Sequence, residues 1–155
     1  MNKLLISIFL LAAAITSVSA REIKPFTTDY CTGYFEGTRA HPGLWKDCCL
    51  EHDLYFWAGG SSEERNQADK RLRACVADKG ASIHARFIYW GVKLGSKSPI
   101  KIKGKHWGNG LSDSPTYLSL TPEQVQSIEM ELNKGYPIIP TLILENFLRD
   151  LHHRN

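Results

Sequence analysis

The amino-acid sequence predicts an all-α protein: a disulfide-stapled helical bundle organised around an antiparallel helix pair. Three observations lead to this expectation. Two helical stretches meet at a very short glycine turn, at residues 59–60. Apolar residues recur at helical spacing toward the C-terminus. Four cysteines, an even number in a chain that we expect to be exported, argue for two disulfides with three possible pairings.

The first 20 residues have the composition of a secretory signal peptide. Lys3 supplies the positive charge, residues 4–15 form the apolar segment, and Val18-Ser19-Ala20 is a small-residue cleavage signature. The apolar segment is too short to span a bilayer comfortably. We therefore expect residues 21–155 to form one exported domain, secreted or periplasmic, which acts as a monomer.

We expect the paired helices at residues 44–58 and 62–79. The two glycines of the turn are a stop signal for the first helix. Ser61, with Glu64 three residues later, forms a capping-box signature that starts the second helix, and Gly80 ends it. A connection this short predicts an antiparallel hairpin.

Three further helices should follow the pair. Apolar residues between positions 83 and 92 predict a helix that ends near Lys93. Thr121 followed by proline and then glutamine is a strong helix start, and that helix should end at Gly135. Apolar residues at helical spacing predict a last amphipathic helix over residues 140–152, which packs on the core.

In an antiparallel hairpin, the numbers of two residues that face each other add up to nearly the same value at every level. Two pairs in the helix pair meet this condition at neighbouring levels: His52 with Asp69, and Cys48 with Cys75. The hairpin geometry therefore predicts a His–Asp contact beside a disulfide. Such a contact makes a general base that can take a proton from water.

The remaining two cysteines would then connect a loop to the first helix. Cys49 is left to pair with Cys31, which lies in the glycine-bearing loop of residues 30–43. Asp53 shares a helix face with Cys49 and should point at that loop. A carboxylate beside backbone carbonyls can bind calcium, which can polarise an ester carbonyl. An ordinary connecting loop is the alternative interpretation.

These motifs resemble the signature of the secreted phospholipase A2 family. The segment Cys48-Cys49-Leu50-Glu51-His52-Asp53 is similar to the family pattern of two cysteines, two variable residues and His-Asp. Residues 69–75, in which an aspartate precedes a cysteine by six positions, are similar to the second active-site helix. Tyr30-Cys31 with Gly33 is similar to the start of the calcium loop. The resemblance covers roughly residues 29–76, and the tight turn resembles the compact bacterial and fungal type.

The resemblance implies a phospholipase A2-like fold and roles for individual residues. His52 would activate water toward the sn-2 ester of a glycerophospholipid, and Asp69 would hold His52 in the required tautomer. Calcium would be the cofactor, bound by the Asp53 carboxylate and by backbone carbonyls near three loop residues, Tyr30, Thr32 and Tyr34. The resemblance implies the same two disulfides as the hairpin geometry. The tyrosine that usually supports the family's aspartate is missing, or is displaced to Tyr55.

The charge distribution suggests a partner. Residues 79–112 contain seven Lys or Arg and no acidic residue, together with several aromatic residues. This combination suits an anionic phospholipid membrane surface; a solvated loop with core aromatics is the alternative. The overall net charge of +3 does not indicate a nucleic-acid binder.

Two other functions are compatible with the sequence. One is a non-catalytic lipid- or protein-binding protein on the same scaffold, although the presence of both His52 and Asp53 favours the enzyme. The other is a structural zinc protein that uses Cys48, Cys49 and His52 as ligands, although no CxxC pair is present.

Overall fold

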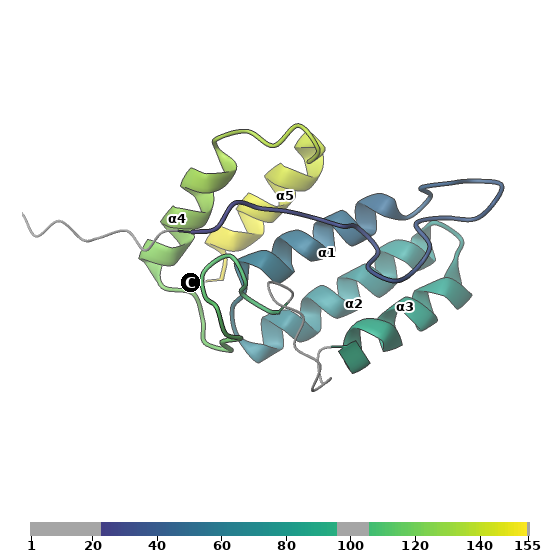
Figure 1. The fold of residues 1–155 in the computed structure, drawn as a ribbon, viewed down its shortest axis with the longest axis horizontal. Coiled ribbons are helices and arrows are strands. Elements are labelled where there is room, and N and C mark those ends of the chain that lie inside the picture. The colour runs from purple at the N-terminus through teal and green to yellow at the C-terminus, as the bar shows by residue number, and fades with distance from the viewer. Residues whose placement is uncertain (1–22, 96–105, 155) are drawn as a thin grey trace, which may run out of the picture.

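The computed structural model describes residues 23–95 and 106–154 (Figure 1). These residues form five helices and no strand, so the expected all-α fold is confirmed. The helices are α1 (Lys46–Ala58), α2 (Ser62–Asp78), α3 (Ser82–Gly95), α4 (Pro122–Leu132) and α5 (Thr141–His152). The expected signal peptide and residues 96–105 of the basic stretch lie outside the described residues. Among the residues described, no helix is long and apolar enough to cross a membrane.

Helices α1 and α2 form the predicted antiparallel hairpin. Gly59 and Gly60 have φ angles of 80° and 127°, which residues with a side chain rarely adopt, and this explains why glycine occupies the turn. The capping box at the start of α2 is confirmed: the Glu64 amide donates to Ser61 Oγ at 3.3 Å, and the Ser61 amide donates to Glu64 Oε2 at 2.6 Å.

Helix α1 begins two residues later than expected, because Trp45 belongs to the preceding loop. The Trp45 amide donates to the Glu36 carbonyl at 2.9 Å, and its indole Nε1 donates to the Phe35 carbonyl at 2.5 Å. Helix α4 ends at Leu132 and not at Gly135, because the chain leaves the helix in a short turn. The last helix starts at Thr141, with Pro140 as its N-terminal flanking residue.

The remaining helices cover the hairpin on different sides. Helix α3 packs on α2, whereas α5 packs on α1 and α4 packs on α5. In Figure 1, α1, α2 and α3 lie side by side, and α4 and α5 gather at one end. One core cluster lies among α1, α4 and α5 and includes Trp57 and Phe147. The second lies among α1, α2 and α3 and includes Trp45 and Ala85, together with Cys48 of a disulfide.

A loop around Trp107 closes the hairpin turn from outside. The Gly108 amide donates to the Phe56 carbonyl at 2.7 Å, and the Gly110 amide donates to the Trp57 carbonyl at 3.0 Å. The Trp107 indole, which is buried, donates to the Gly60 carbonyl at 2.7 Å. The bonds to Phe56 and Trp57 satisfy carbonyls at the C-terminal end of α1 that lack a partner within the helix, and all three bonds hold the loop against the hairpin turn.

A buried carboxylate at the end of α4 fastens the N-terminal segment to the bundle. Glu131 is 2% exposed; it accepts hydrogen bonds from Lys134 Nζ and from the Tyr136 hydroxyl, both at 2.5 Å. The bond from Lys134 and then that from Tyr136 hold the pKa of Glu131 below its usual range. The Tyr136 oxygen in turn accepts from the Phe26 amide at 3.1 Å.

Candidate active site

The structure brings His52 of α1 and Asp69 of α2 into direct contact. His52 Nε2 lies 3.0 Å from Asp69 Oδ1, and the two residues are 8% and 1% exposed. An ionised carboxylate only accepts hydrogen bonds, so a neutral His52 must carry its proton on Nε2 at this contact. The other ring nitrogen, Nδ1, is then left as a base. This is the arrangement that the hairpin register predicts.

The second carboxylate oxygen of Asp69 faces a residue that the sequence reasoning did not connect with it. Lys93 of α3 places its Nζ 3.4 Å from Asp69 Oδ2, and that oxygen has no hydrogen bond within the described part of the chain. The separation is long for a hydrogen bond but suits an ion pair, so Lys93 balances the buried charge of Asp69. Lys93 is also held by Asn66, to whose side-chain oxygen it donates at 2.5 Å.

An aromatic residue defines the other side of the histidine. The Phe56 ring stacks on the His52 imidazole, with ring centroids 5.7 Å apart and planes at 30°. Phe56 comes one turn after His52 on α1 and also makes an edge contact with Trp107. The imidazole is therefore fixed by a carboxylate at one nitrogen and by a ring against its face.

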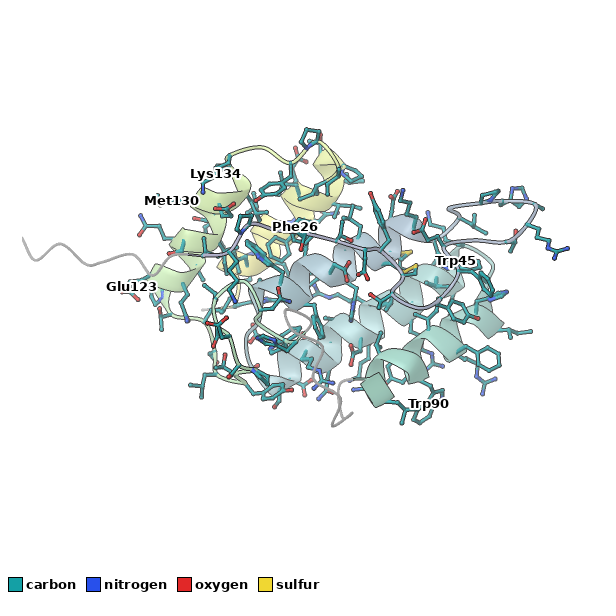
Figure 2. All side chains as sticks on the ribbon, in the orientation of Figure 1. Phe26, Trp45, Trp90, Glu123, Met130 and Lys134 are labelled. Carbon is teal, nitrogen blue, oxygen red and sulfur yellow. A yellow bond between two sulfur atoms is a disulfide. The ribbon has the colours of Figure 1, made fainter. Side chains whose placement is uncertain are left out.

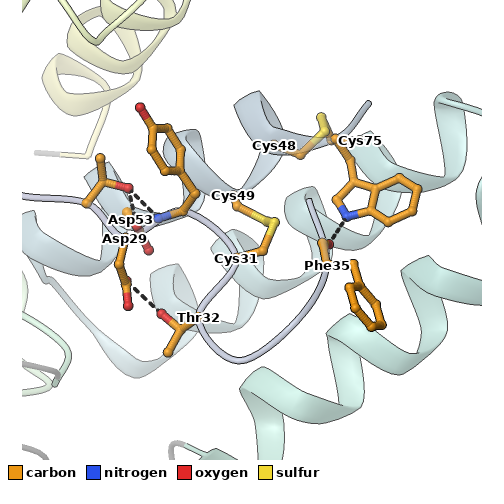
Figure 3. Close-up of a disulfide and its surroundings, with 11 residues drawn as sticks. Asp29, Cys31, Thr32, Phe35, Cys48, Cys49, Asp53 and Cys75 are labelled. Carbon is orange, nitrogen blue, oxygen red and sulfur yellow. Dashed lines mark hydrogen bonds between the residues drawn. A yellow bond between two sulfur atoms is a disulfide. The ribbon is translucent and has the colours of Figure 1, made fainter. Parts of the chain in front are cut away.

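Two disulfides lock this geometry, with the pairing expected from the sequence. Cys48 is bonded to Cys75 and joins α1 to α2 one turn from the His–Asp contact. Cys31 is bonded to Cys49 and ties the preceding loop to α1 (Figure 3). No free cysteine remains, so the alternative of a zinc site that uses Cys48, Cys49 and His52 is wrong.

The loop meets α1 at Asp53. Thr28 Oγ1 donates to Asp53 Oδ2 at 2.5 Å and accepts from the Tyr30 amide at 2.9 Å. Tyr30 has a φ angle of 58°, which is uncommon for a residue with a side chain, and its ring lies under the Lys46 ammonium at 4.0 Å. A strained conformation held by several contacts is typical of a functional loop.

Asp29 is a second carboxylate of this loop that the sequence reasoning missed. It directly follows Thr28, the residue bonded to Asp53, and its Oδ1 accepts from Thr32 Oγ1 at 2.7 Å (Figure 3). A sequence signal exists: Asp29 lies two residues before Cys31, and Asp53 lies four residues after Cys49, so the disulfide draws both acids to one region.

The loop carbonyls named from the resemblance have different surroundings. The Tyr30 carbonyl accepts from the Thr32 amide at 3.0 Å. The Tyr34 side chain turns toward α3, where its hydroxyl lies 3.0 Å from His84 Nδ1. The described residues contain no cluster of three or more His, Cys, Asp or Glu side chains that could hold a metal. A hard cation here would depend on carboxylates of the Asp29–Asp53 region supplemented by carbonyls and water, which is a donor set that calcium accepts.

Tyr55 does not support Asp69. Its hydroxyl donates to Asp150 Oδ2 of α5 at 3.0 Å, and Arg71 of α2 donates to both groups. Burial raises the pKa of Tyr55 well above its usual range. Burial also acts to raise the pKa of Asp150, but the hydrogen bond and charge of Arg71 outweigh it and leave that pKa below its usual range. Tyr55 thus joins α5 to the hairpin.

Comparison of the chain with protein families, with curated proteins and with solved structures found no match.

Proposed function

We propose that the protein is a calcium-dependent phospholipase A2, which hydrolyses the sn-2 ester of glycerophospholipids. The observation that carries this proposal is the buried contact between His52 Nε2 and Asp69 Oδ1, at 3.0 Å, between two disulfide-linked helices. A carboxylate-oriented histidine is suited to activating water. The resemblance of the surrounding motifs supplies the substrate class.

His52 acts as the general base in this mechanism. Asp69 accepts a hydrogen bond from the protonated Nε2 and so leaves the Nδ1 lone pair for an incoming water molecule. Water gives one proton to Nδ1 as its oxygen attacks the sn-2 carbonyl carbon. The tetrahedral intermediate then expels the glycerol oxygen, which takes the proton back from Nδ1. The products are a fatty acid and a lysophospholipid.

Lys93 and Phe56 are positioning residues in this mechanism. The Asp69 carboxylate, whose Oδ2 lies 3.4 Å from Lys93 Nζ, stabilises the imidazolium that forms during the reaction. Phe56 keeps the ring plane fixed. The base is therefore oriented before the substrate arrives, which lowers the reorganisation needed in the transition state.

Asp53 and Asp29, with carbonyls of the loop that includes Tyr30, Thr32 and Tyr34, are the residues that would hold calcium. When bound, the cation would polarise the ester carbonyl and stabilise its developing negative charge. Two carboxylates support this assignment, Asp29 on the disulfide-tethered loop and Asp53 on α1, because calcium takes oxygen ligands in flexible geometry.

The setting we propose is an exported monomer that works at an anionic phospholipid membrane and does not bind nucleic acid. The two disulfides support an oxidising compartment, outside the cell or in a periplasm. The basic residues of positions 79–112 support a negatively charged surface.

The test uses vesicles of phosphatidylglycerol and phosphatidylcholine with a radiolabelled sn-2 acyl chain. We expect the oxidised protein to release the labelled fatty acid with calcium and to lose this release in excess chelator. The same vesicles labelled at sn-1 are the control and should yield labelled lysophospholipid. Release that the chelator does not affect would remove the calcium assignment. No release under any condition, from a folded sample, would favour the non-catalytic binding protein.

A further inference from the structure

Helix α3 is apolar on two opposite faces. One face packs on α2 through Ala85 and Ile88, which are 1% and 6% exposed. The opposite face carries four large apolar side chains that are 61–71% exposed: Ile83, Phe87, Trp90 and Leu94. Their spacing of four, three and four residues places them in one line along the helix. We name this line the outer stripe.

The outer stripe is not an ordinary solvent-facing helix surface. A surface helix normally carries polar and charged residues opposite its buried face. Here Trp90 lies on the outer side of α3 and points away from the bundle, whereas Trp45 lies within it (Figure 2). An exposed, continuous apolar line of this kind marks an interaction surface.

Positive charge borders the outer stripe. Arg86 is exposed and lies three residues from Ile83 and four from Trp90, so it lies beside the stripe. Arg73 of α2 and Lys93 of α3 both lie over the Tyr89 ring, at 5.5 and 5.6 Å from its centroid. Helix α3 contains no acidic residue. The surface is therefore a line of apolar side chains with a cationic margin.

We propose that the outer stripe docks the protein on an anionic phospholipid bilayer, with Phe87 and Trp90 in the interface and Arg86 and Arg73 on lipid phosphates. Amphipathic helices bind membranes through this combination of apolar area and cationic charge. A second copy of the chain fits less well, because an antiparallel two-fold contact between outer stripes would place each cationic margin against itself.

The same helix contacts the candidate active site at two points. His84, in the first turn of α3, lies 3.0 Å from the Tyr34 hydroxyl of the loop. Lys93, in the last turn, pairs with Asp69 at 3.4 Å. Helix α3 therefore links the outer stripe on one side to the candidate active site on its other side. In this respect the proposal rests on the proposed function and deepens it.

The chain contains a built-in reporter for the test. Three of its four tryptophans, Trp45, Trp57 and Trp107, are 0–2% exposed, whereas Trp90 is 61% exposed. A blue shift of tryptophan emission on vesicle binding therefore reports on Trp90. The probe is vesicles of ether-linked phosphatidylglycerol, which have no acyl ester to cleave, compared with ether-linked phosphatidylcholine. We expect the shift and co-sedimentation with phosphatidylglycerol vesicles, with salt weakening the binding.

Two variants localise the contact. The double variant Phe87→Ser with Leu94→Ser keeps Trp90 and should bind phosphatidylglycerol vesicles about tenfold or more weakly, because it removes apolar area from the interface. The variant Arg86→Gln should weaken binding about fivefold, as expected for one basic residue at an anionic surface. The matched control is Leu118→Ser with Leu142→Ser, two similarly exposed apolar residues outside α3, which should bind as the wild type does.

Specific results would overturn the docking proposal. One is the absence of an emission shift with phosphatidylglycerol vesicles, and another is an equal loss of binding in the control variant. A third is a wild type that is a dimer without lipid while the Phe87→Ser/Leu94→Ser variant is a monomer. Near-UV circular dichroism shows that each variant is folded, and Arg86→Gln provides a second test if the double variant is not. Failure of ester hydrolysis would overturn the proposed enzyme but leave vesicle binding to ether lipids intact, so the two failures are distinguishable.

Discussion

Replacing Gly59 with alanine tests how the hairpin turn is held. Gly59 has φ 80° and ψ −154°, a backbone region that is essentially limited to glycine. A Cβ at this position would lie 2.6 Å from Gly108 Cα, which is backbone and cannot rotate away. The Trp107 loop would have to move off α1, and the Gly108–Phe56 hydrogen bond of 2.7 Å would be strained or lost.

The expected loss of unfolding free energy in Gly59→Ala is large for the addition of a single methyl group. Backbone strain contributes about 1–3 kcal/mol, and the loss of one or two buried hydrogen bonds about 1 kcal/mol each. We therefore expect Gly59→Ala to lower the free energy of unfolding by about 2–5 kcal/mol. Gly80→Ala is the matched control, because Gly80 also has a positive φ of 78° but open space around its Cβ position; its cost should be about 1–2 kcal/mol.

Urea denaturation of the oxidised proteins measures this difference. With a slope of roughly 1–3 kcal/mol per molar urea, the Gly59→Ala midpoint should lie about 1 M below that of Gly80→Ala. Equal midpoints for the two variants would refute the reasoning, because they would show that the Trp107 loop does not pack closely on the turn.

Three other variants test the site and its support. Asp69→Asn should lower the rate of sn-2 hydrolysis roughly 10²–10⁴-fold, because the histidine loses the carboxylate that orients it and stabilises its charged form; initial rates measure this, with the exposed Asp78→Asn as control. Replacing Cys48 and Cys75 with alanine should cost about 3–4 kcal/mol of unfolding free energy, since the bridge closes a loop with a sequence separation of 27 residues; thermal unfolding checks it. Glu131→Gln should lower the free energy of unfolding by about 1–3 kcal/mol at pH 7. The difference in unfolding free energy between wild type and this variant should become smaller as pH falls below 4.5, the ordinary pKa of this carboxyl.

The direction of the Glu131 effect follows from its lowered pKa. A carboxyl whose pKa is depressed in the folded state contributes stability that is present above its unfolded pKa, and this stability is lost as pH falls through the folded value. A difference in unfolding free energy between wild type and Glu131→Gln that stayed constant from pH 7 to pH 2 would contradict the role of ionised Glu131. For the other two variants, the contradicting results are an Asp69→Asn enzyme of wild-type rate and an unchanged melting temperature after removal of the Cys48–Cys75 bridge.

The helix pair and its contacts could be predicted because they depend on local rules. The glycine turn and the capping box fix where two helices end and begin, and the register of a hairpin follows from residue numbering. The contact of His52 with Asp69 and the Cys48–Cys75 bridge therefore followed from the sequence. The start of α1 at Lys46 did not, because Trp45 is engaged by a loop carbonyl.

The contacts between distant segments could not be predicted in the same way. Lys93 reaches Asp69 only because α3 folds back on α2, and Tyr55 reaches Asp150 across 95 positions of sequence. Periodicity alone also does not tell which of two apolar faces of α3 is buried. The structure buries Ile88 and exposes Phe87, although the two are adjacent in the sequence.

The central claim is that His52, oriented by Asp69, is the base in phospholipid ester hydrolysis. The most direct measurement is the initial rate of sn-2 fatty-acid release by wild type and by His52→Ala, with calcium present and both proteins folded and oxidised. We predict a rate loss of roughly 10²-fold or more in the variant. Release by His52→Ala at the wild-type rate would contradict the assignment of His52 as the base.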